Sequence, residues 1–191
     1  MSSSTAPHLF CPLCGKPLQN SIIDDHPRST CLDCSYVHWG DYSLGVGGVL
    51  WYNGKVLLVQ RGYNPGKGMW TIPGGYVDQG ESIGEAVIRE IQEETGIQAK
   101  PLSIIALRDQ PGEKHDTYVI FLMQFLGGTL QGQPEEVSNL GFFTLDECHS
   151  LPIASLTLSA LEASHSVSQG LVINSDVKLF GALSSTLYQV P

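Results

Sequence analysis

One stretch of the chain, from Gly75 to Ile97, constrains the fold more than any other, because it carries the start and stop signals of a single helix. Ser82 and Glu85 stand three residues apart as a capping box, which predicts that a helix begins there. Gly96 stands where a left-handed C-terminal cap is expected. Between these ends the apolar residues Ile83, Val87 and Ile91 recur every four positions, which predicts one buried face.

The same predicted helix carries three glutamates on one face. Glu90, Glu93 and Glu94 stand at i, i+3 and i+4, so their carboxylates lie side by side. A solvated acidic face is the ordinary interpretation of such a cluster. Here Pro73-Gly74-Gly75 precedes the cluster and both helix ends are capped at fixed offsets, which favours a divalent cation, Mg²⁺ or Mn²⁺, bound by oxygen ligands.

Every position of the Gly75–Ile97 segment matches the pattern G-x5-E-x7-R-E-U-x-E-E-x-G-U, where U is a bulky aliphatic residue. The chain therefore resembles the Nudix hydrolases. The resemblance implies an α/β fold, an α/β/α sandwich with a mixed sheet. It also implies metal-dependent hydrolysis of a nucleoside diphosphate linked to another group.

The resemblance further implies roles for individual residues. The expected metal ligands are the backbone carbonyl of Gly75 and the carboxylates of Glu90, Glu93 and Glu94, and one of these glutamates or a loop glutamate takes the proton of the attacking water. We expect Glu94 to be the indispensable ligand. Glu81 and Arg89 are interpreted as supports that orient the helix and the preceding loop.

A further acidic pair, Glu135 and Glu136, lies in the polar loop over residues 127–137. By the resemblance, a glutamate in this loop binds another metal ion or acts as the base. We assign Glu135 to the metal and Glu136 to catalysis, although their spacing alone does not choose between them. Two solvated loop acids remain the alternative.

The N-terminal part carries two C-x2-C pairs sixteen residues apart, which are Cys11, Cys14, Cys31 and Cys34. This spacing predicts a tetrathiolate Zn²⁺ site. With four protein ligands the site is closed and therefore structural. Two disulfides or a redox pair are the alternatives, but disulfides are typical of secreted chains and nothing in the sequence points to secretion. Cys148 is expected to be a small buried residue.

These features divide the chain into a zinc ribbon over residues 1–40, a Nudix domain over residues 41–170 and a tail over residues 171–191, for which no function is predicted. Asn53-Gly54 predicts a β-hairpin between strands at 44–52 and 55–60. Other expected elements are a linker at 36–41, strands at 102–108, 117–126 and 140–144, a polar loop at 109–116 and a helix at 153–168.

A zinc ribbon directly before the Nudix domain resembles the NADH pyrophosphatases and a related group that acts on FAD or ADP-ribose. The Ser-Gln-Pro-Trp-Pro-Phe-Pro signature of the NADH enzymes is absent from residues 107–118. We therefore rank FAD or ADP-ribose first, with release of AMP, then NADH, then a nucleoside triphosphate. Expected substrate contacts are Arg61, Trp70, Pro111 and Tyr118; for Trp70, structural packing is an equal alternative.

Composition limits the remaining function classes. With 42% apolar and 15% charged residues the chain is globular, and its net charge of −9 argues against nucleic acid and anionic membrane as partners. Without a long apolar run or signal-peptide features, the cytoplasm is the expected location. A non-catalytic, nucleotide-sensing regulator is the alternative from another class, but no basic DNA-binding module appears. The ribbon could also support a homodimer.

Overall fold

The computed structural model describes residues 9–166, 170–174 and 187–189. The chain divides into two compact units. The first, called the ribbon unit, comprises Met1–Ser43 and Gln110–Asp116; the second, called the larger unit, comprises Leu44–Asp109 and Thr117–Pro191.

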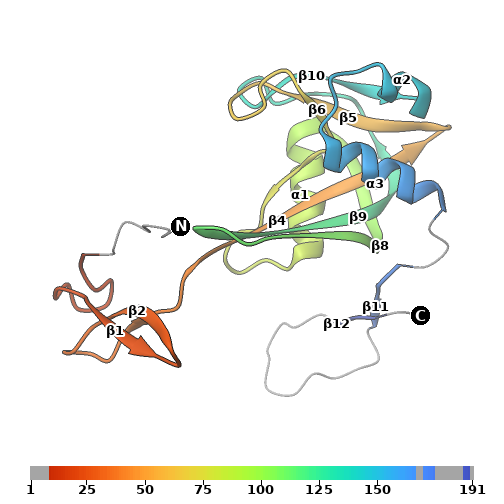
Figure 1. Ribbon diagram of the computed structural model, residues 1–191. Helices are drawn as coiled ribbons and strands as arrows, with labels where there is room; N and C mark the ends of the chain where they lie inside the picture. The colour runs from red at the N-terminus through yellow and green to blue at the C-terminus, as the bar shows by residue number, and fades with distance from the viewer. Residues whose placement is uncertain (1–8, 167–169, 175–186, 190–191) are drawn as a thin grey trace. The chain divides into compact units, whose positions relative to one another are not determined.

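The ribbon unit is built on a three-stranded antiparallel sheet in the order β1-β2-β3 (Figure 1). Its strands are β1 (Gln19–Ile23), β2 (His26–Thr30) and β3 (Val37–His38). Strand β3 lies inside the segment that was predicted to be a linker, so that prediction was wrong. The two residues form a strand because they pair with the end of β2, a long-range contact that a two-residue run cannot reveal.

The larger unit is organised around a seven-stranded mixed sheet in the order β10-β5-β4-β9-β8, with β6 paired to β5 and β7 paired to β4. The strands are β4 (Asp41–Tyr52), β5 (Lys55–Arg61), β6 (Trp70–Thr71), β7 (Gly74–Tyr76), β8 (Ile97–Gln110), β9 (Lys114–Gly128) and β10 (Val137–Phe143). The predicted hairpin between β4 and β5 is confirmed. Asn53 and Gly54 at its turn have φ of 51° and 74°, the left-handed pair that this turn type requires.

Strands β8 and β9 are longer than predicted. The polar segment 109–116 was expected to be a loop, but only residues 111–113 connect the two strands. Backbone hydrogen bonds between neighbouring strands need no apolar side chains, so pairing continues beyond the apolar residues that marked the strands in the sequence.

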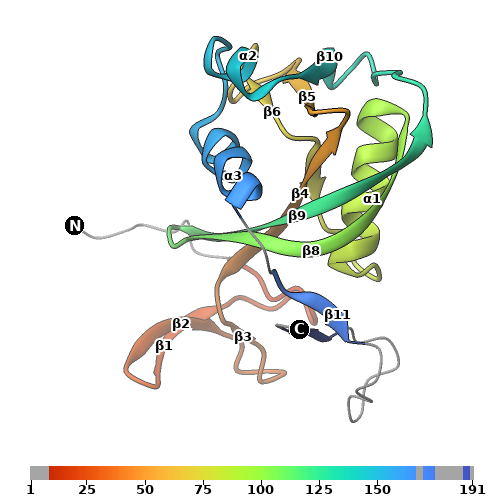
Figure 2. The ribbon, with the colours of Figure 1, turned by 90° about the vertical axis from the view of Figure 1, so that its right-hand side faces the viewer.

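The described residues contain three helices: α1 (Ile83–Thr95), α2 (Leu145–His149) and α3 (Ser155–Ser166). Figures 1 and 2 show α1 on one face of the sheet and α3 on the other, which makes the α/β/α sandwich that the sequence predicted. The buried face of α1, including Val87 and Ile91, packs with one apolar cluster of the sheet, and Leu161 of α3 belongs to the cluster on the opposite face.

The start and end of α1 are those predicted. The hydroxyl of Ser82 accepts from the backbone N–H of Glu85 at 3.2 Å, and the Glu85 carboxylate accepts from the N–H of Ser82 at 2.8 Å. Gly96 closes the helix with φ of 71°. The predicted helix over residues 153–168 begins at Ser155, and residues 167 and 168 lie outside the described residues.

Part of the tail pairs with the sheet and packs on its core. Strands β11 (Val172–Asn174) and β12 (Leu187–Gln189) pair antiparallel. Leu171 exchanges two backbone hydrogen bonds with Ile104 of β8, of 2.8 and 3.1 Å. Tyr188 lies edge-on to Phe121, with ring centroids 5.9 Å apart, and packs against the core cluster that includes α1. Residues 175–186 lie outside the described residues.

Candidate functional site

The acidic site is organised by two glycines of β7. This strand pairs with β4, Val46 opposite Gly75 and Gly47 opposite Gly74, and helix α1 packs on it. A Cβ added to Gly75 would lie 2.4 Å from Oε1 of Glu90, so only glycine lets this carboxylate lie directly against the strand. A Cβ on Gly74 would lie 2.1 Å from the carbonyl oxygen of Val46. Gly74 is therefore required by its close approach to backbone, whereas a side chain at position 75 would displace the Glu90 carboxylate.

Glu94 reaches the same strand from the end of α1. Its Oε2 accepts from the backbone N–H of Gly74 at 2.8 Å. Burial raises the pKa of Glu94 to about 8; the Gly74 hydrogen bond opposes this shift, while the charges of Glu90 and Glu136 add to it. Without a cation beside it, this carboxyl therefore carries its proton at neutral pH.

Glu90 lies in the same partly buried environment. Burial raises its pKa, the neighbouring Arg89 opposes the shift, and the charges of Glu93 and Glu136 add to it. Of the two loop glutamates, Glu136 is the one whose charge raises the pKa of both Glu90 and Glu94. The charge of Glu136 therefore acts on the acidic cluster, and its catalytic role remains a prediction.

Arg89 joins α1 to the loop that precedes it, and all five of its N–H groups are used. Two of them donate to the carboxylate of Glu81, at 3.1 and 2.7 Å, and one donates to the carbonyl of Tyr76 at 3.1 Å. The other two donate to Glu90 at 2.9 Å and to Glu93 at 3.1 Å. Glu81 in turn accepts from the N–H of Asp78 at 2.8 Å. This geometry is that of a support that orients the helix, and it supports the roles predicted for Glu81 and Arg89.

Glu93 differs from its two neighbours on the helix. Its side chain is 52% exposed and paired with Arg89. Within the described part of the chain, the four cysteines form the one group of three or more potential ligands close enough to share an ion. Glu90 and Glu94, however, offer oxygen donors whose pKa values are raised by burial, for Glu90 in spite of its ion pair with Arg89. This donor chemistry fits a hard divalent cation.

The predicted substrate contacts lie in different environments. Trp70 is 5% exposed and packs edge-on against Phe143, with ring centroids 4.7 Å apart. This supports a structural packing role for Trp70 rather than a substrate contact. Tyr118 is largely buried, with its ring across Gly45 and Gly47, and burial raises the pKa of its hydroxyl. Pro111 lies in the exposed β8–β9 connection and belongs to the ribbon unit.

Arg61 is the last residue of β5, and the loop that follows it, residues 62–69, contains no other residue that the sequence predicted for the site. The guanidinium of Arg61 lies 4.8 Å from the ring centroid of Tyr63. Gly62 donates its N–H to the backbone carbonyl of Glu136 at 2.8 Å. Abundant glycine and proline in this loop were the one sign of a close approach, and nothing in the sequence singled out Tyr63.

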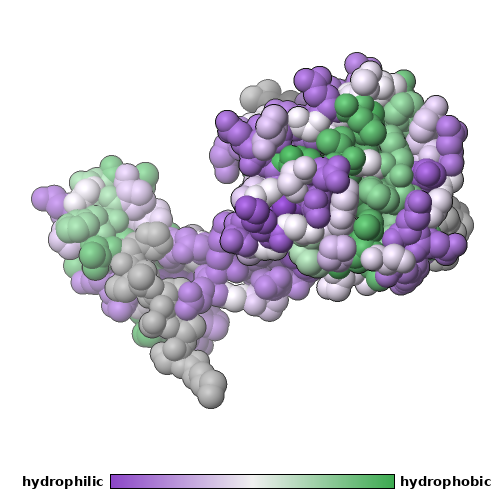
Figure 3. Space-filling view, turned by 90° about the horizontal axis from the view of Figure 1, so that it is seen from above, coloured by the Kyte–Doolittle hydropathy of each residue, from purple (hydrophilic) through white to green (hydrophobic). Residues whose placement is uncertain are grey.

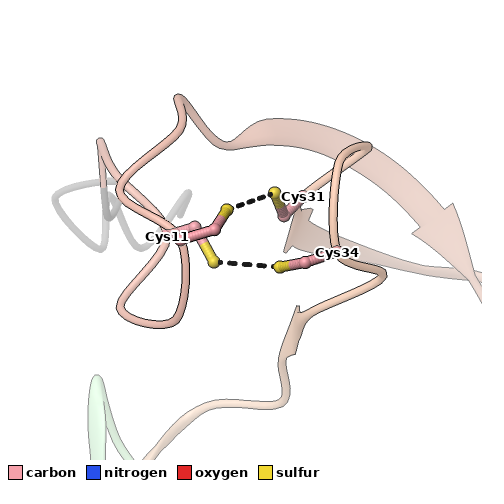
Figure 4. A group of neighbouring side chains, drawn as sticks. Cys11, Cys31 and Cys34 are labelled. Atoms are coloured by element: carbon pink, nitrogen blue, oxygen red, sulfur yellow. Dashed lines mark hydrogen bonds between the residues drawn. The ribbon is translucent and has the colours of Figure 1, made fainter.

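The four cysteines of the ribbon unit converge on one point (Figure 4). Their sulfur atoms all lie within 4.8 Å of one another, with Cys11 and Cys34 at 3.5 Å and Cys14 and Cys31 at 3.5 Å. Sulfurs about 2.3 Å from a tetrahedral zinc ion would be about 3.8 Å apart, whereas a disulfide requires about 2.05 Å. The arrangement therefore fits Zn²⁺, and the four cysteines form no disulfide in this structure.

Each cysteine pair is held by a tight turn. Cys11 donates its N–H to Lys16 and Cys31 donates to Tyr36, at 2.7 and 2.8 Å. Gly15 after the first pair has φ of 70°, and Ser35 takes φ of 58° at the corresponding position.

Figure 3 shows apolar surface on the ribbon as well as on the larger unit. Leu13 and Leu32, one from each C-x2-C pair, are 73% and 76% exposed. So small a sheet leaves its apolar residues outside and has little core to hold it together. Its stability is therefore expected to depend on the bound ion.

Comparison with known proteins identifies both parts of the chain. Residues 41–161 match the NUDIX domain family, and residues 9–39 match the Nudix N-terminal family, a zinc ribbon. Over 112 residues the chain is 34% identical to an ADP-ribose pyrophosphatase of Methanocaldococcus jannaschii, covering 57% of this chain and 66% of that protein. Over 150 residues it is 31% identical to the NAD-capped RNA hydrolase NudC of Stutzerimonas stutzeri, covering 76% of this chain and 51% of that protein.

A solved structure supports the fold. The NUDIX hydrolase from Nitrosomonas europaea superposes with a TM-score of 0.71 at 24% identity, covering 80% of this chain and 88% of that one. The chain spans between half and two-thirds of the length of the two relatives above. No helix in the described ranges is long and apolar enough to cross a membrane.

Proposed function

The chain belongs to the Nudix family, and on that premise we propose that it hydrolyses the pyrophosphate bond of a nucleoside diphosphate derivative with the help of Mg²⁺ or Mn²⁺. The observation that carries this proposal is the pair Glu90 and Glu94, two partly buried carboxylates held against the glycines of β7 with raised pKa values. Groups perturbed in this way by burial and by each other are typical of functional sites.

The residues divide the work as follows. Glu90, Glu94 and the backbone carbonyl of Gly75 would hold the cation, and Glu93, which is paired with Arg89, would be a further donor. A bound Mg²⁺ or Mn²⁺ supplies neutralisation of phosphate charge and makes water more acidic. Arg89 fixes the position of Glu90 through its grip on Glu81 and Tyr76. Hydrolysis of a pyrophosphate bond depends more on positioning the attacking water and neutralising the phosphate charge than on covalent chemistry by the protein.

Glu136 is our candidate for the base that accepts the proton of the attacking water. Its charge acts on both Glu90 and Glu94, and it lies on an exposed turn that water reaches. Glu135, its exposed neighbour, is kept as the candidate ligand for a further cation. Glutamine substitutions at the two positions separate these roles, because removal of the base lowers the turnover number at saturating metal.

ADP-ribose or FAD is the proposed substrate, cleaved to release AMP. The support is the 34% identity to a relative that is named an ADP-ribose pyrophosphatase. NADH is the second candidate, because the match to the NudC relative extends over 76% of this chain. That relative is named for NAD-capped RNA, so the absence of a nucleic-acid partner stays a prediction.

We also propose domain boundaries, a cellular location and an oligomeric state. The hydrolase domain spans residues 41–170 and the ribbon residues 1–40, with the cytoplasm as location, since a Zn²⁺ site of four thiolates suits a reducing compartment. A homodimer is proposed as well, and gel filtration with and without zinc tests it. A nucleotide-sensing regulator without catalysis is the competing function.

A parallel hydrolysis assay tests the proposed function. The protein is incubated with Mg²⁺ or Mn²⁺ and ADP-ribose, FAD, NADH or a nucleoside triphosphate, and the products are separated by chromatography. We expect AMP from ADP-ribose or FAD at a rate well above the other two. Folded protein that turns over none of the four would favour the regulator.

A further inference from the structure

The loop between β5 and β6 is wrapped around the side chain of Arg61. The backbone of Arg61 donates to the carbonyl of Met69 at 3.0 Å and accepts from the N–H of Gly68 at 2.8 Å. Its Nε donates to the carbonyl of Pro65 at 2.9 Å. Its stem passes Gly66, where an added Cβ would lie 3.4 Å from Cδ and Nε. The guanidinium is therefore held in one place before any ligand arrives.

One face of an exposed aromatic ring lies next to this guanidinium. The central carbon of the guanidinium is 4.8 Å from the centroid of Tyr63, within the range of a cation–π contact. The side chain of Tyr63 nevertheless stays 46% exposed. The contact thus fixes the orientation of the ring and leaves apolar surface open to solvent.

The pair lies beside the acidic cluster. Arg61 is opposite Val137 in the pairing of β5 with β10, and the next residue, Gly62, donates to the carbonyl of Glu136 at 2.8 Å. A Cβ on Gly62 would lie 3.0 Å from that carbonyl oxygen, so the loop and the Glu136 turn are in close contact. The charge of Arg61 also acts on Glu94 and lowers its pKa. The guanidinium therefore lies against the Tyr63 ring and beside the turn that carries Glu136.

We propose that Arg61 and Tyr63 form a nucleoside diphosphate subsite, in which the nucleobase stacks on the exposed surface of the Tyr63 ring and Arg61 binds a phosphate oxygen. This proposal rests on the proposed function and adds to it the direction of the substrate: the base lies over the β5–β6 loop and the diphosphate points toward Glu90 and Glu94. Guanidinium groups suit phosphate oxygens geometrically, and every base offers a face for stacking.

Stacking makes the subsite tolerant of the kind of base and sensitive to its absence. A structural role alone, in which Arg61 and Tyr63 merely hold the loop, makes a different prediction. In that case, loss of the ring would disturb binding of any phosphate compound equally, with or without a base.

Equilibrium binding to the full-length protein with Mg²⁺ separates the two. Isothermal titration with ADP and with inorganic tripolyphosphate, which has no base, is compared for Tyr63→Ala, Tyr63→Phe and the unchanged protein. We expect Tyr63→Ala to weaken ADP binding by about 5- to 150-fold and to leave tripolyphosphate binding unchanged. Tyr63→Phe keeps the ring and should bind ADP as the unchanged protein does.

Tyr52→Ala is the matched control. Tyr52 is 43% exposed and stacks on Phe125, with ring centroids 4.1 Å apart. It lies at the β4–β5 hairpin turn, at the end of β5 opposite to Arg61. Its loss should leave ADP binding unchanged. Equal weakening of ADP and tripolyphosphate by Tyr63→Ala, or no weakening of ADP, would overturn the proposal. Because no turnover is needed, ADP binding that depends on Tyr63 would uphold the subsite even if the hydrolysis assay failed.

Discussion

Replacement of Glu94 by glutamine should make the metal-free protein more stable above neutral pH. In the folded protein, burial raises the pKa of Glu94 from 4.5 to about 8. At about 1.4 kcal/mol for each pKa unit, ionising this carboxyl in the folded state costs up to about 5 kcal/mol relative to the unfolded chain. Glutamine has the same shape, retains an acceptor for the N–H of Gly74 and never ionises.

The pH dependence follows from the direction of the shift. Below the unfolded pKa of 4.5 the Glu94 carboxyl is protonated in both the folded and the unfolded protein, so it does not lower the free energy of unfolding. Between 4.5 and about 8 the folded state binds more protons than the unfolded state, so the free energy of unfolding falls as pH rises. The stability is lost as pH rises through the folded pKa, and Glu94→Gln should not show this loss.

The assay is urea unfolding in buffer without Mg²⁺ or Mn²⁺, at intervals from pH 5 to 9. Trp51 and Trp70 lie in the larger unit, and with Trp39 of the ribbon unit replaced by phenylalanine in both proteins the fluorescence reports on the larger unit. The two proteins should differ by less than about 1 kcal/mol near pH 5, and Glu94→Gln should be more stable by several kcal/mol near pH 9. Parallel curves over this range would refute the assignment of Glu94 as an uncompensated buried acid. Added Mg²⁺ should stabilise the unchanged protein more at high pH than at low pH.

Three further substitutions test the other parts of the site. Arg89→Lys keeps the charge but loses the pair of hydrogen bonds to Glu81, so turnover should fall about tenfold or more. The free energy of unfolding, followed by circular dichroism, should change by about 1 kcal/mol or less. Unchanged turnover would contradict the supporting role. Gly75→Ala places a Cβ 2.4 Å from the Glu90 carboxylate, and Mn²⁺ titration should show weaker binding in a folded protein; wild-type affinity would refute the close approach. Cys31→Ser should lower the zinc content and the thermal stability of the ribbon, yet leave ADP-ribose turnover in place; loss of turnover would mean that the ribbon takes part in catalysis.

Features that the sequence predicted correctly are those in which a few neighbouring residues determine the backbone. Ser82 and Glu85 cap a helix by local hydrogen bonds, Gly96 ends it because it tolerates a left-handed φ, and Asn53-Gly54 turns a hairpin for the same reason. The shared face of the three glutamates on α1 follows from helical spacing. The clustering of the four cysteines follows from the spacing of the two C-x2-C pairs, which lets four sulfur atoms bind one ion.

Features that the sequence did not predict depend on partners distant in the chain. Strand β3 exists because Val37 and His38 pair with β2, and β8 and β9 pair through residues whose polarity suggests a loop. Packing of Tyr188 against Phe121 brings the end of the chain onto the core, and no periodicity marks it. The choice between Glu135 and Glu136 likewise depends on where a loop folds relative to α1.

The most direct test of the central claim is Mn²⁺-dependent turnover of ADP-ribose by the unchanged protein and by Glu94→Gln, with AMP measured by chromatography and folding checked in the same samples. We predict that the unchanged protein releases AMP only with the cation present, and that Glu94→Gln is folded but inactive at every Mn²⁺ concentration. An active Glu94→Gln protein would contradict the claim that Glu94 holds the catalytic cation.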